Sequence, residues 1–205
     1  LGNLQSKYGY ESFDEIQGII DGFRSRSIPL DCIIIDLYWF GIETMGNLDF
    51  QNTGNWANPE TRLAEFRAQG IKTIPITEPQ VTGLSFNQPE LEAQGLLGER
   101  PEGGAYGFPL SWVTNNALTY LIDFTNPDAR TWWKDKHEKL IVDYGFDGFW
   151  QDLNEPEAEP GDIVYHAGSG QAVGNAIAVN MNRALDDAMR DFAPEKRSFI
   201  MSRSG

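Results

Sequence analysis

The chain has 205 residues, 40% of them hydrophobic and 12% aromatic, a composition typical of a globular protein and not of a disordered one. Its formal charge of −14 argues against nucleic-acid binding, which needs clustered lysine and arginine, and no apolar run approaches the ~20 residues of a membrane span. The only cysteine, Cys32, excludes an internal disulfide, and its apolar surroundings over residues 32–35 predict a buried, unreactive thiol.

The first third of the chain alternates strand-like and helical patterns. Residues 1–10 are a candidate first strand, and Ser12 with Glu15 has the spacing of a capping box at a helix start. Apolar residues then recur at helical spacing: Ile16, Ile19, Ile20 and Phe23. Pro29 precedes an expected strand over residues 30–40, which is rich in β-branched and aromatic residues.

The rest of the chain continues this alternation around one irregular segment. Pro59 begins a predicted helix that ends at Gly70, and a strand over 71–77 follows. Residues 83–117 are rich in Gly, Pro, Asn and Gln without a steady period, which predicts a long loop or small insertion. The remaining predictions are a short strand at 120–124, a helix over 126–144, a strand over 148–153, a helix over 173–193 and a strand over 198–202.

Repeated strand–helix–strand units predict a parallel α/β sheet with right-handed crossovers. About five units are present, too few to close a barrel, so residues 1–205 are interpreted as one partial TIM (β/α)8 barrel. The alternative is a complete doubly wound open sheet, but no glycine-rich phosphate loop follows any predicted strand. Because the chain starts at Leu1 and stops at Gly205 directly after a strand-like run, we expect it to be cut from a longer protein.

Acidic residues recur where the predicted strands end, at Asp36, at Glu78, and at Asp152 with Glu155. In parallel α/β folds the carboxyl ends of the strands form the active face. Trp150 shares a strand face with Asp152, because side chains two residues apart point the same way. A carboxylate beside an indole face suits a sugar ring with a reacting anomeric carbon.

Other interpretations of the same residues remain open. Asp152 or Asn154 could cap a helix whose first turn contains Pro156, and Asp36 could be a turn residue. Asp36, Glu78, Asp152 and Glu155 could also be ligands of a metal-dependent barrel enzyme, although neither His137 nor His166 has metal-ligand spacing with them. His137 is expected to be a surface or packing residue, and His166 lies on the loop after the Asp152 strand.

Residues 146–156, FDGFWQDLNEP, closely resemble the nucleophile strand of glycoside hydrolase family 31, whose pattern is an aromatic, any residue, Asp, usually Met, then Asn-Glu-Pro. Leu153 stands where Met is common and Glu78 where Asp is frequent. Further stretches resemble family motifs in the same order: 28–36 (second strand), 78–81 (end of the third), 123–127 with 132–133 (the helix before the nucleophile strand) and 202–204 (the arginine strand). Residues 36–41 and 45–48 resemble a bacterial branch that includes glucosidases and α-1,4-glucosyl-transferring enzymes.

The resemblance implies a retaining hydrolase of α-glucosides or oligosaccharides, with Asp152 as the nucleophile and no metal or other cofactor. It further implies that Asp36 binds the far hydroxyls of the sugar, that Trp150 and Val81 form walls of the same subsite, and that Arg203 reaches both the sugar and the carboxylates. Glu155 would brace the loop. The family's acid/base lies beyond the arginine strand, so we expect it outside residues 1–205 and expect the isolated fragment to be inactive and poorly soluble or oligomeric.

Two alternative functions remain open beside hydrolysis. The first is an α-1,4-glucosyl-transferring enzyme of the same family, which differs in whether water or a second sugar takes the glycosyl group. The second is a non-catalytic sugar-binding module that retains the start of the barrel, which would bind saccharide without forming a covalent intermediate.

Overall fold

The protein is described from a computed structural model that covers residues 2–51, 53–110, 113 and 117–204. Its main sheet has five parallel strands in the order β1-β2-β3-β6-β9. These are β1 (Leu4–Lys7), β2 (Cys32–Ile35), β3 (Lys72–Thr77), β6 (Phe149–Gln151) and β9 (Ile200–Ser202). The predicted partial α/β barrel is therefore confirmed, with strand neighbours following chain order as in a (β/α)8 barrel.

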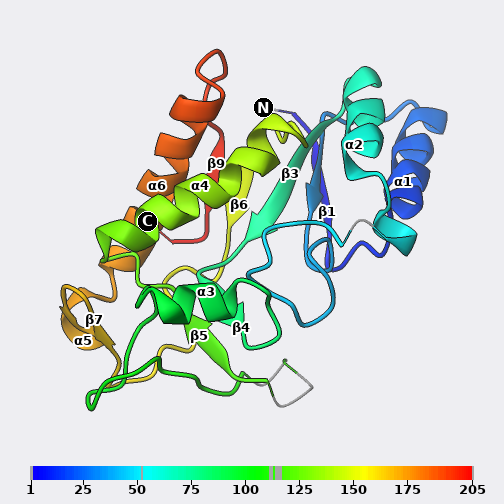
Figure 1. The fold of residues 1–205 in the computed structure, drawn as a ribbon. Coiled ribbons are helices and arrows are strands. Elements are labelled where there is room, and N and C mark those ends of the chain that lie inside the picture. The colour runs from blue at the N-terminus through cyan, green and yellow to red at the C-terminus, as the bar shows by residue number, and fades with distance from the viewer. Residues whose placement is uncertain (1, 52, 111–112, 114–116, 205) are drawn as a thin grey trace.

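Four longer helices cover one face of this sheet (Figure 1): α1 (Phe13–Ser25), α2 (Pro59–Ala68), α4 (Pro127–Val142) and α6 (Ala176–Phe192). Their ends have the predicted local chemistry. The Ser12 hydroxyl accepts a hydrogen bond from the Glu15 backbone N–H at 3.0 Å, and the Asn126 side chain accepts one from the Asp128 N–H at 2.9 Å. Gly70, at φ +78°, ends α2 in the left-handed conformation that glycine adopts without strain.

Several predicted strands and helices are shorter in the structure than the sequence pattern suggested, and two of them are instructive. The strand expected over 30–40 stops at Ile35, because the chain turns at residues 37–40 and Tyr38 adopts φ +75°, which no strand contains. The helix expected from residue 173 is split into the single turn α5 (Gly170–Val173) and α6, which starts at Ala176.

The described part of residues 83–117 contains a short helix, α3 (Gln88–Ala93), which the sequence pattern did not reveal. Antiparallel strands β4 (Gln80–Thr82) and β5 (Thr119–Leu121) flank it, so the strand predicted at 120–124 pairs with β4 and not with the barrel sheet. The Asn87 amide donates to the carbonyls of Gly46 and Asn47, both at 2.8 Å, and Asn47 Oδ1 accepts from the Phe86 N–H at 3.1 Å. These bonds attach the insertion to the loop after β2. The smaller elements are a 3-10 helix, η1 (Gly54–Trp56), and a hairpin of β7 (Val164–Tyr165) and β8 (Gly168–Ser169).

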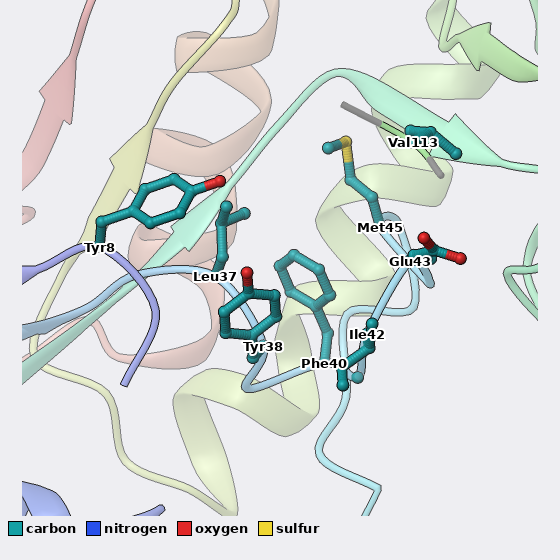
Figure 2. Close-up of a pocket in the computed structure, with 9 residues that line it drawn as sticks. Tyr8, Leu37, Tyr38, Phe40, Ile42, Glu43, Met45 and Val113 are labelled. Carbon is teal, nitrogen blue, oxygen red and sulfur yellow. The ribbon is translucent and has the colours of Figure 1, made fainter. Parts of the chain in front are cut away.

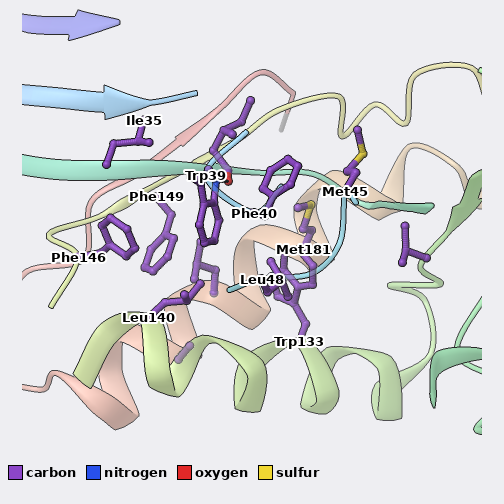
Figure 3. Close-up of a cluster of buried hydrophobic side chains, with 14 of the residues drawn as sticks. Ile35, Trp39, Phe40, Met45, Leu48, Trp133, Leu140, Phe146, Phe149 and Met181 are labelled. Atoms are coloured by element: carbon purple, nitrogen blue, oxygen red, sulfur yellow. Dashed lines mark hydrogen bonds between the residues drawn. The ribbon is translucent and has the colours of Figure 1, made fainter. Parts of the chain in front are cut away.

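The main core lies between the helix-facing side of the sheet and the helices (Figure 3). Trp39 is fully buried there, and its indole N–H donates to the Ile76 carbonyl at 3.1 Å, which joins the turn after β2 to β3. Phe50 stacks against this indole edge to face, at 5.1 Å between ring centroids. A buried aromatic of this size contributes about 3–5 kcal/mol to stability when compared with alanine.

The opposite side of the sheet carries a second apolar cluster, made of Cys32, Ile34 and Ile74 with Trp150 and Met201 against them. Alternation along each strand sends these side chains away from the helices, toward what is the interior of a barrel. Burial raises the pKa of the Cys32 thiol to about 12, so this cysteine is inert, as predicted. In the described part of the chain, no helix is long and apolar enough to cross a membrane.

His137 is a fully buried core residue in the middle of α4. It lies between two aromatic rings, 4.7 Å from Trp133 and 5.1 Å from Phe149 by ring centroids, and its Nδ1 is 2.7 Å from the Trp133 carbonyl. Burial lowers the pKa of His137 from 6.5 to about 4. Of the surface and packing roles expected for His137, the structure supports packing. The imidazole is neutral at pH 7.

This buried imidazole predicts acid-sensitive stability. Below pH 6.5 His137 becomes protonated in the unfolded chain, whereas in the folded chain it stays neutral down to about pH 4. The free energy of unfolding therefore decreases as the pH falls through this window. The free energy of unfolding of the wild type, compared with His137→Gln, should therefore fall by about 3 kcal/mol between these two pH values. Urea denaturation at several pH values measures it. His166→Gln, which removes the other histidine from an exposed position, is the control and should follow the wild-type curve.

Candidate active site

Four neighbouring strands each deliver a charged residue directly after their last position. Asp36 follows β2, Glu78 follows β3, Asp152 follows β6 and Arg203 follows β9. The backbone continues the ladder at this rim, because the Asp152 N–H donates to Thr77 O and the Arg203 N–H donates to Gln151 O, both at 3.0 Å. Parallel pairing therefore brings together four of the residues selected from the sequence.

Arg203 is the cation of this rim and follows the edge strand β9. Its guanidinium forms a two-point hydrogen bond with Glu155, both contacts at 2.7 Å, and donates to Glu157 at 2.6 Å. Its Nε lies 3.4 Å from Oδ1 of Asp152. The pKa of Glu155 is lowered, chiefly by its hydrogen bond from Arg203. Glu155 thus holds the arginine against the carboxylate cluster, and sequence analysis did not anticipate the second acidic partner, Glu157.

Burial perturbs all three rim carboxylates in the same direction. The Asp152 side chain is 14% exposed, and burial raises its pKa, opposed by the Leu153 N–H and by Arg203. Burial also raises the pKa of Asp36, opposed by the Leu37 N–H, which donates to Oδ1 at 2.7 Å. The pKa of Glu78 is raised well above its usual range by burial and then by the charges of Asp36 and Asp152. Carboxylates with perturbed pKa values that gather at one end of a parallel sheet are typical of catalytic sites.

Trp150 lies one side-chain layer below Asp152 on the same face of the sheet. It is opposite Ile76 on β3 and Met201 on β9, and it packs against the inner apolar cluster while remaining partly exposed. Val81 is placed differently: it is fully buried on β4, where a Cβ added to Gly46 would lie 2.7 Å from its side chain. The structure therefore brings Trp150 to the carboxylate rim and leaves Val81 covered by the loop after β2.

Asn154 is a supporting residue that sequence analysis noted only as a possible helix cap. It is fully buried; its amide donates to the Ser202 hydroxyl at 2.9 Å and its carbonyl oxygen accepts from the Ser204 N–H at 3.1 Å. Residues 153–158 form turns, so the interpretation of Asp152 or Asn154 as a helix cap is wrong. The side chain instead ties the loop after β6 to the chain on both sides of Arg203.

A hollow of about 220 Å³ opens at the loop that follows Asp36 in the chain (Figure 2). Tyr8 after β1, with Tyr38 and Ile42 from the loop after β2, supplies much of its surface, and Tyr8 and Ile42 are 70% and 72% exposed. Aromatic and aliphatic walls, with a buried carboxylate at the start of the loop, suit a ligand with both apolar faces and hydroxyl groups.

Two other features bear on the rival interpretations. Among the described residues, no three His, Cys, Asp or Glu side chains are arranged to hold a metal ion, so the geometry gives the metal-dependent interpretation no support. His166 is exposed, and its backbone N–H donates to Asp123 Oδ2 at 2.6 Å. Its position in the turn of the β7–β8 hairpin is therefore fixed through the main chain.

Consecutive parallel strands that send charged side chains to one rim are the arrangement of a (β/α)8-barrel active face. Residues 1–205 match the family model described as "Glycosyl hydrolases family 31 TIM-barrel domain". The chain is 29% identical over 221 residues to alpha-glucosidase 2 of Bacillus thermoamyloliquefaciens, and 27% identical over 190 residues to an alpha-xylosidase of Emericella nidulans. These alignments cover 100% and 92% of this chain, and 27% and 24% of the two relatives.

Solved structures give the same result. The Flavobacterium johnsoniae GH31 dextranase complexed with glucose superposes with a TM-score of 0.89 at 27% identity, over 100% of this chain and 25% of that one. An Aspergillus niger xylosidase superposes with a TM-score of 0.82 at 25% identity, over 100% of this chain and 31% of that one. The chain belongs to glycoside hydrolase family 31, and it spans about a quarter to a third of the length of these relatives.

The rim network predicts that Arg203 stabilises the fold more than an ordinary surface arginine does. Arg203→Ala leaves three carboxylates facing one another, and because the guanidinium is partly exposed we expect a loss of about 1–2 kcal/mol. Arg190→Ala is the matched control: it breaks a single pair with Asp186 on α6, where the arginine is 72% exposed, and should cost about 0.3–0.5 kcal/mol. Urea denaturation at low salt compares the two, and equal losses would contradict a special role for Arg203.

Proposed function

We propose that the protein containing this chain hydrolyses α-glucosides with retention of anomeric configuration, with Asp152 as the nucleophile. The observation that carries the proposal is the position of Asp152: it is mostly buried at the end of β6, beside the cation Arg203 and above the indole of Trp150. Arg203 favours the ionised carboxylate, which is the form that attacks. Membership of family 31 and the similarity to alpha-glucosidase 2 support this choice of reaction.

In the proposed first step an Asp152 oxygen bonds to the anomeric carbon, and the bond from that carbon to the leaving oxygen breaks. A second carboxylic acid, ~5–5.5 Å from the nucleophile in a retaining enzyme, gives its proton to the leaving oxygen. Water then attacks the anomeric carbon, losing its proton to the same residue, and releases Asp152. We propose that this acid/base is contributed from outside residues 1–205, as the family pattern implies.

The other rim residues have proposed roles in binding. Asp36 accepts hydrogen bonds from sugar hydroxyls in the cleavage subsite, Trp150 forms part of its wall, and Arg203 contacts hydroxyls while it orients Asp152. Glu155 supports Arg203 through its two-point hydrogen bond. Val81 is a wall residue only if the loop after β2 moves away from it, because its side chain is fully covered.

α-Glucosides are the proposed substrates, and the activity on them should be compared with the activity on related α-glycosides. Relatives named as α-xylosidases and a structure named as a dextranase align with the same part of this chain. Aryl α-glucosides, aryl α-xylosides and isomalto-oligosaccharides should therefore be assayed together. The glucoside is expected to give the highest kcat/KM. Product analysis with an added acceptor sugar separates hydrolysis from glucosyl transfer, since transfer gives a longer saccharide at the expense of free glucose.

Asp152→Gly should abolish turnover of an aryl α-glucoside, because the covalent route is lost. The smaller side chain also leaves room for an external nucleophile, so added azide should restore release of the aryl group and give a glycosyl azide of inverted configuration. Asp147→Asn is the matched control: Asp147 lies before the other end of β6, where it binds Lys72 at 2.8 Å, and turnover should be retained. Normal activity of Asp152→Gly without azide would exclude the assignment.

Asp36→Asn should lower kcat/KM for the same substrate about 100-fold. Charge-assisted hydrogen bonds contribute ~1.5–3 kcal/mol each, and more than one sugar hydroxyl is expected to bind this carboxylate. Asp21→Asn, at an exposed position on α1, controls for the charge change and should leave kcat/KM unaltered. A change of less than about threefold in Asp36→Asn would favour the turn-residue interpretation instead.

A further inference from the structure

Glu78 differs from the other two rim carboxylates in that, among the described residues, no hydrogen-bond donor or cation contacts its carboxyl group. It is 2% exposed, and its Oε1 is enclosed without a hydrogen-bond partner in the described structure. Asp36 accepts the Leu37 N–H. Oδ1 of Asp152 also has no hydrogen-bond partner in the described structure, but the guanidinium of Arg203 lies 3.4 Å from it. A buried ionised carboxylate without a donor or a cation is strongly unfavourable, and the usual outcome is that the group takes up a proton.

The position of Glu78 in the sheet makes its ionisation still less favourable. β3 lies between β2 and β6, so the carboxyl of Glu78 is placed between the strand ends that carry Asp36 and Asp152. The Asp152 N–H, bonded to Thr77 O at 3.0 Å, holds the end of β6 beside the residue that precedes Glu78. Three carboxylates at neighbouring strand ends each disfavour ionisation of the others, and the least solvated and least compensated one should remain protonated.

We propose that Glu78 is a positioning residue that stays a neutral carboxylic acid and carries the proton of this cluster, so that Asp36 and Asp152 both remain ionised. Its link to catalysis rests on the proposed function, because Asp152 must be ionised to attack a sugar. The protonation state itself does not depend on any activity.

The charged surroundings support the assignment. The groups that face Glu78 are Asp36 from β2 and Asp152 from β6, and both raise its pKa in addition to burial. The cation described at the rim, Arg203 after β9, is paired with Asp152, Glu155 and Glu157. The proton therefore belongs on Glu78, and the arginine keeps Asp152 charged.

Infrared difference spectroscopy of the whole protein tests the protonation state directly. At pH 7 the wild type should show the C=O stretch of a protonated carboxyl, shifted in heavy water, and Glu78→Gln should lack this band. Glu138→Gln, an exposed glutamate on α4, is the matched control and should keep the band. Absence of the band from the wild type, or its persistence in Glu78→Gln, would overturn the proposal. Thermal denaturation establishes that both variants are folded.

The pH dependence of kcat/KM on an aryl α-glucoside tests the catalytic consequence. Replacing a neutral acid by a neutral amide changes no charge, so the acid limb of Glu78→Gln should coincide with that of the wild type. If Glu78 were ionised, the substitution would remove a negative charge beside Asp152 and move this limb to lower pH by about one unit. Such a shift contradicts the proposal. Failure of the wild type to hydrolyse any glycoside would contradict the proposed function alone, since the infrared result would still decide the state of Glu78.

Discussion

The parallel register of the five strands is the constraint on which the site depends. The side-chain period of a strand is two, so a slip of a single residue would send Asp36, Glu78 or Asp152 to the helix-covered side of the sheet. The register is held by the apolar faces on both sides. Ile35 and Phe149 belong to the core beneath the helices, while Ile34, Ile74 and Trp150 belong to the inner cluster. Packing that serves stability thus also fixes which residues reach the rim.

At that rim, negative charge is concentrated and compensated unevenly. Arg203 pairs its single positive charge with Asp152, Glu155 and Glu157, while Asp36 accepts a hydrogen bond from a backbone N–H. Asn154 contributes by holding the chain around Arg203 in place, and so acts on the carboxylates only through the arginine. The positions of the charged side chains therefore depend in part on the hydrogen bonds of the buried, uncharged Asn154.

The sequence was sufficient for features that repeat or that have a local chemical signature. Helical spacing after Ser12 and the proline at position 59 located α1 and α2. The acids at the ends of predicted strands, Asp36, Glu78 and Asp152, are three of the four rim charges. The sequence was insufficient where the decisive fact is tertiary. Tyr38 leaves the extended conformation although its neighbours favour a strand, and α3 has too few residues to show a period. The covered position of Val81 and the uncompensated burial of Glu78 depend on which loop lies above each side chain, and no local pattern records that.

The hydrogen bonds between the insertion and the loop after β2 have an evolutionary consequence. Asn87 and Asn47 each satisfy backbone groups of the other segment, so neither segment keeps its shape if its partner is replaced alone. The loop after β2 also borders the hollow shown in Figure 2. Grafting an insertion from one relative into another would therefore reshape the mouth of the pocket unless residues 41–48 were transplanted with it. In an alignment of relatives, the two segments should accordingly vary together as one exchangeable unit, while the barrel strands beneath them drift independently.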